Sequence, residues 1–310
     1  ALSCRELDAS RTVGELLRNI WDPGSRQDLR GLSIVLESNF EILEDGRRLR
    51  VARVGSGPPL VLLHGYPDNL QIWSELAPKL ADRFEVIAFD WPGMGYSDAW
   101  PGGASPFQMA NRLLSLLDRW GIEKATVAGI DMGGQPALVF AAQHPERTSA
   151  LAVMNSLVLW DEVTSWEIAL LRKFQLNRLI IRRFPRLVFN RAERTFLPPG
   201  TSLSHELRSD LWEAFNRTEV RKFISRMCAG YQGTLPRLPE FYSRINCPTL
   251  ILWGENDKHF PPAHAERLHR AISGSQLSIV PDGEHWMVWY LAQKVATALK
   301  AFQNWTRWPT

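Results

Sequence analysis

Short apolar runs alternate with longer amphipathic stretches along most of the chain. The runs are too short and too continuously apolar for strands with one solvent-facing side, and they suit strands that are covered on both faces. The stretches between them carry apolar residues at helical spacing, such as Met109, Leu113 and Leu117. This alternation predicts an α/β fold with a mostly parallel sheet. The strand-like runs are residues 60–63, 84–89, 125–130, 151–154, 249–253 and 277–280.

The first part of the chain departs from this alternation. Residues 34–54, with the turn signal Asp45-Gly46, predict an antiparallel hairpin that opens the sheet. Residues 1–32 predict a separate helical extension that ends near Asp22-Pro23-Gly24.

Between residues 157 and 241 the strand signal disappears and helical periodicity replaces it. We expect Pro198-Pro199-Gly200 to break the helices here, and also Gly230 and Gly233. This stretch predicts a helical cap inserted into the core. The predicted organisation is an N-terminal extension (1–32), a core (33–156 and 242–310) and a cap (157–241).

The composition is that of a globular chain. Of the 310 residues, 45% are hydrophobic and 22% charged, which excludes a disordered protein. No apolar run is long enough to predict a membrane span, and charged residues interrupt the first thirty positions. The three cysteines have neither disulfide-scaffold nor zinc-ligand spacing. These features predict a soluble, cytoplasmic protein.

The net charge of +3 gives no support for nucleic-acid binding, but the charge is unevenly distributed. Residues 172–194 contain eight basic residues and a single acid, Glu193. One interpretation is a solvated, arginine-rich helical face. The other is a surface that attracts an anionic substrate, partner or lipid head group.

The strongest local motif is Gly129-Ile130-Asp131-Met132-Gly133-Gly134, which lies between a strand-like and a helix-like run. A nucleophile elbow needs small residues two positions before and after the reactive residue, because larger side chains would collide with nearby backbone. The reactive position here is Asp131. Taken alone, an aspartate flanked by glycines also fits a turn or a helix cap.

Three further motifs follow other strand-like runs. They are residues 64–67 (HGYP), 254–257 (GEND) and 283–286 (GEHW). The chain order is therefore nucleophile, acid and histidine, with Asp257 and His285 in the second and third roles. His259 competes for the role of base, and Asp257 alone also fits a turn residue. We favour His285 because it follows the final strand.

With these four motifs, residues 33–303 resemble the α/β-hydrolase superfamily. The Asp nucleophile and the HGYPD stretch resemble its epoxide hydrolase and haloalkanoate dehalogenase branch, whereas esterases and lipases of this fold use serine. The resemblance implies an eight-stranded, mostly parallel sheet flanked by helices, with a helical cap after the sixth strand.

An aspartate at the elbow indicates attack on a saturated (sp³) carbon. Attack on an ester carbonyl would form an anhydride, whereas displacement at a saturated carbon forms an alkyl ester. We expect the N–H groups of Tyr66 and Met132 to form the oxyanion hole, and an ionised Asp131 at the helix N-terminus. His285, oriented by Asp257, would activate water to hydrolyse the ester. This chemistry requires no metal or organic cofactor.

The sequence indicates the leaving group less clearly than the nucleophile. Epoxide hydrolases usually supply two cap tyrosines as proton donors. Tyr231 stands in the late cap, with Tyr242 a weaker candidate, but residues 157–230 contain no tyrosine. A tryptophan such as Trp160 is a third candidate.

The usual dehalogenase residues are also missing. Met132 stands where haloalkane dehalogenases have tryptophan, and Met132 and Gln135 stand where fluoroacetate dehalogenases have arginines. We therefore expect an epoxide hydrolase acting on an amphiphilic or acidic small molecule. The alternatives are a dehalogenase with a non-standard halide site, an enzyme that opens strained lactones, and a non-catalytic ligand-binding homologue.

Overall fold

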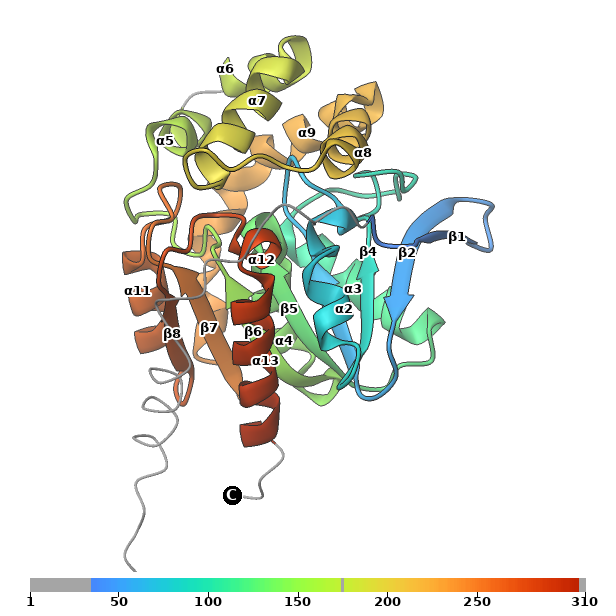
Figure 1. Cartoon of the computed structure of the whole chain (residues 1–310), viewed down its shortest axis with the longest axis vertical. Helices are drawn as coiled ribbons and strands as arrows, with labels where there is room; N and C mark the ends of the chain where they lie inside the picture. The colour runs from blue at the N-terminus through green and yellow to red at the C-terminus, as the bar shows by residue number, and fades with distance from the viewer. Residues whose placement is uncertain (1–34, 174–175, 307–310) are drawn as a thin grey trace, which may run out of the picture.

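The computed structural model describes residues 35–173 and 176–306, which form one eight-stranded sheet with helices on both faces and above one edge (Figure 1). The spatial order of the strands is β1-β2-β4-β3-β5-β6-β7-β8. This order and the flanking helices confirm the predicted α/β-hydrolase fold. The strands are β1 (Asn39–Ile42), β2 (Arg48–Val54), β3 (Pro59–Leu63), β4 (Glu85–Phe89), β5 (Ala125–Ile130), β6 (Thr148–Met154), β7 (Thr249–Gly254) and β8 (Gln276–Val280).

The direction of the strands determines where functional loops can meet. β1 and β2 form the predicted antiparallel hairpin, and β2 pairs antiparallel with β4. From β4 to β8 every neighbouring pair is parallel. The loops after β3, β5, β7 and β8 therefore emerge at the same edge of the sheet, where ligands bind in α/β folds.

Helices cover both faces of the sheet, and strand residues such as Leu62, Val127 and Ile251 are fully buried between the two layers. In one layer α2 contacts α13. In the other layer α4 contacts α3 and α10, and α10 contacts α11. These helices are α2 (Leu76–Leu80), α3 (Pro106–Arg119), α4 (Gly134–Gln143), α10 (Pro239–Tyr242), α11 (Ala263–Ala271) and α13 (Ala292–Thr306); the short helices η1 (Leu70–Trp73), η2 (Asp131–Gly133), η3 (Pro145–Arg147) and α12 (Met287–Tyr290) connect core elements.

Among the described residues, five helices between β6 and β7 lie above the carboxyl edge of the sheet (Figure 1). We refer to them as the cap helices, and η4 (Leu235–Arg237) then leads to α10. Arg50 on β2 links them to the core, because its guanidinium donates to both carboxylate oxygens of Asp210, at 3.1 and 2.8 Å. The cap helices are α5 (Trp166–Lys173), α6 (Leu176–Arg183), α7 (Pro185–Phe196), α8 (His205–Asn216) and α9 (Thr218–Thr234).

One expectation about the cap is wrong. α9 continues through Gly230 and Gly233, which we expected to break it. A glycine inside a helix costs only about 1 kcal/mol relative to alanine. Both glycines are exposed, whereas Phe223, Ile224 and Tyr231 of the same helix are buried, so packing outweighs that cost.

Two other expectations concern the ends of the chain and membrane insertion. The predicted helical extension, residues 1–32, lies outside the described residues. Within residues 35–173 and 176–306, no helix combines the length and the apolar character needed to cross a bilayer.

Candidate active site

Asp131 occupies a strained turn between β5 and α4. Its φ angle is +49°, in the left-handed region that non-glycine residues seldom adopt. The backbone around this turn is so close that side chains at the flanking glycines would collide with it. A Cβ atom on Gly129 would lie 2.3 Å from the Gly133 carbonyl oxygen, and one on Gly133 would lie 2.2 Å from the Leu63 carbonyl oxygen. The two glycines therefore allow the sharp turn that presents Asp131 above the sheet.

The carboxylate of Asp131 lies against backbone donors from two loops. The Tyr66 N–H donates to Asp131 Oδ2 at 3.0 Å, and the Met132 N–H also interacts favourably with this carboxylate. Gly65 makes this approach possible, because a Cβ atom there would lie 2.3 Å from Oδ2. The geometry brings both predicted oxyanion donors to the predicted nucleophile.

His285 lies between two carboxylates. Its Nδ1 is 2.8 Å from Asp257 Oδ2, and its Nε2 is 3.9 Å from Asp131 Oδ1. The other oxygen of Asp257 accepts from the backbone N–H groups of His259 and Phe260, at 2.8 and 3.1 Å. Asp257 is therefore fixed and orients the imidazole with its Nε2 toward Asp131.

Burial and charge act in opposite directions on these three groups. Burial favours a neutral His285, but the charges of Asp257 and Asp131 outweigh it and raise the pKa of His285. Burial also opposes ionisation of Asp257, yet its bond to His285 keeps the pKa of Asp257 below its usual value. For Asp131, burial outweighs His285 and the N–H donors and raises the pKa. Asp257 is thus the carboxylate best suited to stabilise a charged imidazole.

His259, the competing candidate for the base, is engaged elsewhere. Its Nδ1 is 2.9 Å from Ser165 Oγ and its Nε2 is 2.9 Å from Thr195 Oγ1. Burial and the nearby His285 lower the pKa of His259 to about 4. Both ring nitrogens therefore serve the packing between cap and core, and His285 is the histidine that faces Asp131.

Asn155, at the end of β6, joins the loops that carry the three residues. Its side-chain amide donates to the backbone carbonyls of Glu284 and His285, and its side-chain oxygen accepts from the Gly254 N–H at 2.8 Å. Its own carbonyl accepts from the Asp131 N–H at 3.0 Å. Asn155 was not predicted from the sequence, because only the fold shows that a residue after β6 reaches both other loops.

Asp68, the last residue of HGYPD, is a further buried acid near the site, and it was not predicted from the sequence. Neither of its carboxyl oxygens has a hydrogen-bond partner of good geometry among the described residues. Burial and the charge of Asp131 raise the pKa of Asp68 to about 8, against opposing effects of His285 and the Trp286 indole. Its burial therefore favours the protonated form of Asp68, close to the His285–Asp131 pair.

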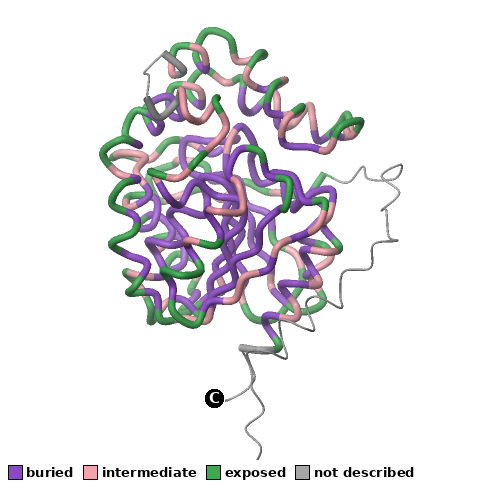
Figure 2. The backbone as a smooth tube through the Cα atoms, turned by 90° about the vertical axis from the view of Figure 1, so that its left-hand side faces the viewer, coloured by how far each residue is buried: buried purple, intermediate pink, exposed green. Residues whose placement is uncertain are grey.

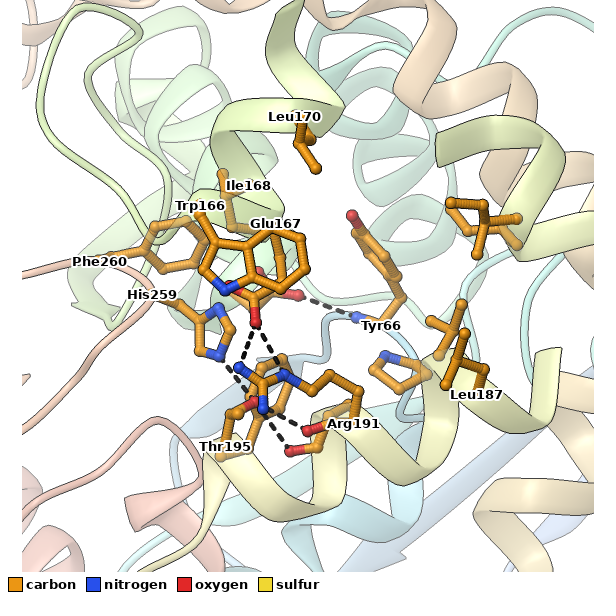
Figure 3. Close-up of a pocket in the computed structure, with 17 residues that line it drawn as sticks. Tyr66, Trp166, Glu167, Ile168, Leu170, Leu187, Arg191, Thr195, His259 and Phe260 are labelled. Carbon is orange, nitrogen blue, oxygen red and sulfur yellow. Dashed lines mark hydrogen bonds and ion pairs between the residues drawn. The ribbon is translucent and has the colours of Figure 1, made fainter. Parts of the chain in front are cut away.

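A cavity of about 290 Å³ is lined by Asp131 and by residues of α5, α6 and α7. Figure 3 shows the residues that surround it. Its wall is mainly apolar, with Ile181, Leu187 and Phe196 among the lining residues. One ion pair interrupts this lining: Arg191 on α7 donates to Glu167 on α5, at 2.8 and 2.6 Å. Such a cavity suits a mainly apolar small molecule. Within the described ranges, no three His, Cys, Asp or Glu side chains are grouped as metal ligands.

The three candidate leaving-group residues have different environments. Tyr231 on α9 is buried near Asp131, whose charge helps burial raise the pKa of its phenol. The hydroxyl of Tyr242 instead donates to the Val158 carbonyl, and Tyr242 does not line the cavity. Trp160 packs against the core and is not part of the cavity wall either. Tyr231 does not line the cavity either, so its case rests on its proximity to Asp131, whereas the hydroxyl of Tyr242 is engaged by the Val158 carbonyl.

Tyr66 has a second feature that the sequence analysis did not use. Its ring lines the cavity and its hydroxyl points into it (Figure 3). That hydroxyl accepts from the Cys228 thiol on α9 at 3.6 Å, and Tyr231 is among the groups that raise its pKa. Two phenols, one from the core and one from the cap, therefore lie near Asp131.

Comparison with known proteins agrees with the fold. The sequence profile of the alpha/beta hydrolase fold family matches residues 58–290. The chain belongs to the alpha/beta hydrolase family. Its curated relatives include an uncharacterised protein of Mycobacterium tuberculosis, which is 33% identical over 77% of this chain and 73% of the relative.

Other alpha/beta hydrolases similar to this chain differ in the reactions for which they are named. A 2-hydroxy-6-oxononadienedioate/2-hydroxy-6-oxononatrienedioate hydrolase of Klebsiella pneumoniae is 30% identical over 79% of this chain and 88% of its own length. A solved structure from Pseudomonas aeruginosa, provisionally named an epoxide hydrolase, aligns with a TM-score of 0.77 and 23% identity, covering 89% of this chain and 98% of that one. This structural likeness supports the fold, and the family membership supports a hydrolase.

Proposed function

We propose that this alpha/beta hydrolase attacks a saturated carbon with Asp131 and forms a covalent alkyl ester. The observation that carries the proposal is the geometry of the Asp131 carboxylate. One oxygen is held by the Tyr66 N–H at 3.0 Å, and the other faces His285 Nε2 at 3.9 Å. The first oxygen suits the carbonyl of an ester, and the second suits the oxygen that forms the new bond.

The reaction would proceed in two steps. Asp131 Oδ1 attacks the substrate carbon, the bond from that carbon to its leaving group breaks, and an ester forms. His285 then removes a proton from water, and the resulting hydroxide attacks the ester carbonyl, whose oxygen is stabilised by the Tyr66 and Met132 N–H groups. Asp257 stabilises the imidazolium during this step. Collapse of the tetrahedral intermediate releases the alcohol and regenerates Asp131.

The leaving group we favour is the oxygen of an epoxide. Opening of the ring produces an alkoxide, which needs a proton donor. Tyr231 and Tyr66 are suited to this role, because both phenols lie near Asp131 and their raised pKa values keep them protonated. Tyr66 would take the place of the second cap tyrosine that epoxide hydrolases usually have.

Displacement of a halide is the second candidate. Trp166 on α5 lines the cavity and offers an indole N–H, the type of group that stabilises a departing halide. A halide needs no proton donor, so the two leaving groups make different demands on Tyr66 and Tyr231. This difference separates the two reactions experimentally.

The central experiment uses His285→Gln, which removes the base but leaves Asp131. The variant is incubated separately with aryl epoxides, alkyl epoxides and bromoalkanes, and the intact mass is recorded. We expect an adduct equal to the whole epoxide, mapping to Asp131. An adduct equal to the alkyl group, with bromide released, would instead support a dehalogenase. No adduct with any of these substrates would contradict attack on a saturated carbon, and tight binding without turnover would favour a ligand-binding homologue.

The proton donors are tested with Tyr66→Phe and Tyr231→Phe. Tyr66→Phe retains the backbone N–H, so it tests the phenol separately from the oxyanion hole. We expect each variant to slow epoxide opening by about 10²-fold or more, without slowing any displacement of bromide. Tyr242→Phe is the matched control, since its hydroxyl binds the Val158 carbonyl outside the cavity. Equal activity of all three variants on epoxides would contradict the proposed donors.

A further inference from the structure

The outer part of the cap exposes large apolar side chains together with arginines. Leu179 and Phe184 are 54% and 60% exposed, on α6 and at its junction with α7. Arg182, Arg183 and Arg186 are exposed between and beside them. We refer to these five residues as the outer cap face. In Figure 1, α6 lies at the top of the molecule, and Figure 2 shows that much of the chain at this end is exposed.

The acids of the neighbouring cap segments do not neutralise this face. Glu167 pairs with Arg191, and Glu193 pairs with Arg208. Asp161 and Glu162 both pair with Arg267 on α11. Among the described residues, no carboxylate forms an ion pair with Arg182, Arg183 or Arg186, although Arg186 lies over the Trp212 ring at 4.6 Å. The outer cap face is therefore both positively charged and apolar.

The cavity opens beside this face. Trp166 and Leu187 line the cavity and are also 64% and 65% exposed, so they form part of its mouth. Leu187 follows Arg186 directly and lies three residues from Phe184. Exposed apolar side chains are therefore present both on the outer cap face and at the cavity mouth.

We propose that the outer cap face docks on an anionic lipid surface and that the cavity takes amphiphilic molecules from it. Apolar side chains that insert at the head-group level, combined with basic residues, are the features that bind a helix to anionic bilayers. A large exposed apolar patch marks an interaction site, and the arginines favour a negatively charged occupant over a neutral one. Docking in this orientation brings Trp166 and Leu187 to the lipid surface.

The test is co-sedimentation of the protein with phosphatidylcholine vesicles, with and without phosphatidylglycerol. We expect binding to the vesicles that contain phosphatidylglycerol, and weaker binding as salt is added. The combined substitutions Arg182→Gln, Arg183→Gln and Arg186→Gln should weaken it by roughly 100-fold. The pair Leu179→Ser and Phe184→Ser should weaken it by at least about tenfold.

Phe40→Ser with Ile42→Ser is the matched apolar control. These side chains are 47% and 56% exposed on β1, away from the cap. We expect the control to bind vesicles like the wild type. All variants should retain turnover of a water-soluble short substrate, so failure of lipid docking is distinguishable from failure of the Asp131 chemistry.

Three outcomes would overturn the proposal. The first is the absence of binding to vesicles with phosphatidylglycerol. The second is binding that neither set of cap substitutions weakens. The third is a dimer, detected by light scattering, that Leu179→Ser with Phe184→Ser dissociates, which would identify the outer cap face as a contact between two copies of the chain.

Discussion

Gly65→Ala is expected to displace the proposed nucleophile together with the turn that carries it. The three atoms nearest to a Cβ at this position all belong to the Asp131 side chain, and Oδ2 would be only 2.3 Å away. Ordinary contact between such atoms begins near 3.4 Å. The carboxylate must therefore move by about 1 Å, which breaks its 3.0 Å bond with the Tyr66 N–H.

The size of the effect follows from the loss of one oxyanion donor. Removal of such a donor lowers kcat by about 10²–10³-fold, which corresponds to about 3–4 kcal/mol of transition-state stabilisation. We expect Gly65→Ala to lose activity in this range on the substrate identified with His285→Gln. Gly230→Ala is the control, because a Cβ atom there has no neighbour within 4 Å and alanine favours a helix.

The assay compares steady-state rates and thermal melting of the two alanine variants with those of the wild type. An inactive Gly65→Ala with a Tm close to that of the wild type would agree with a displaced carboxylate. A well-folded Gly65→Ala with wild-type kcat would refute the argument that Asp131 must occupy this position to react.

Two further predictions concern the buried acids. Asp257→Asn should lower kcat by about 10⁴-fold. The acidic limb of the remaining kcat–pH profile should move to lower pH, because the charge of Asp257 raises the pKa of His285. An acidic limb at the same pH as in the wild type would contradict this role. Asp68 has a pKa of about 8 in the folded protein against 3.8 as a model group, so the folded state holds a proton that the unfolded state loses. Stability should therefore decline as the pH rises from about 4 to about 8. Asp68→Asn should reduce this decline in urea unfolding at several pH values, and parallel curves for variant and wild type would contradict it.

The fold was predictable because its main signals are local. The short apolar runs correspond to strands β3 to β8, and the turn signal Asp45-Gly46 lies in the hairpin of β1 and β2. The motif around Asp131 could be identified because a tight elbow requires glycines at fixed spacing. Local sequence patterns of this kind depend little on the rest of the structure.

Other parts of the site depend on contacts between distant segments. Tyr66 was predicted as a backbone donor, but the environment of its phenol could not be predicted, because it depends on α9 bringing Cys228 and Tyr231 beside it. The pKa of Asp68 likewise depends on a distant segment, the loop after β8, which carries His285 and Trp286. Tyr242 had the right chemistry for a proton donor, yet its hydroxyl points to the Val158 carbonyl.

The most direct test of the account is a single turnover in ¹⁸O-labelled water with excess wild-type enzyme. Attack by Asp131 followed by hydrolysis of the ester transfers an oxygen of Asp131 to the product and an oxygen of water to Asp131. We expect an unlabelled product and a peptide containing labelled Asp131, whichever leaving group is involved. A labelled product with an unlabelled Asp131 would show that water attacks the substrate directly, and would contradict the covalent mechanism.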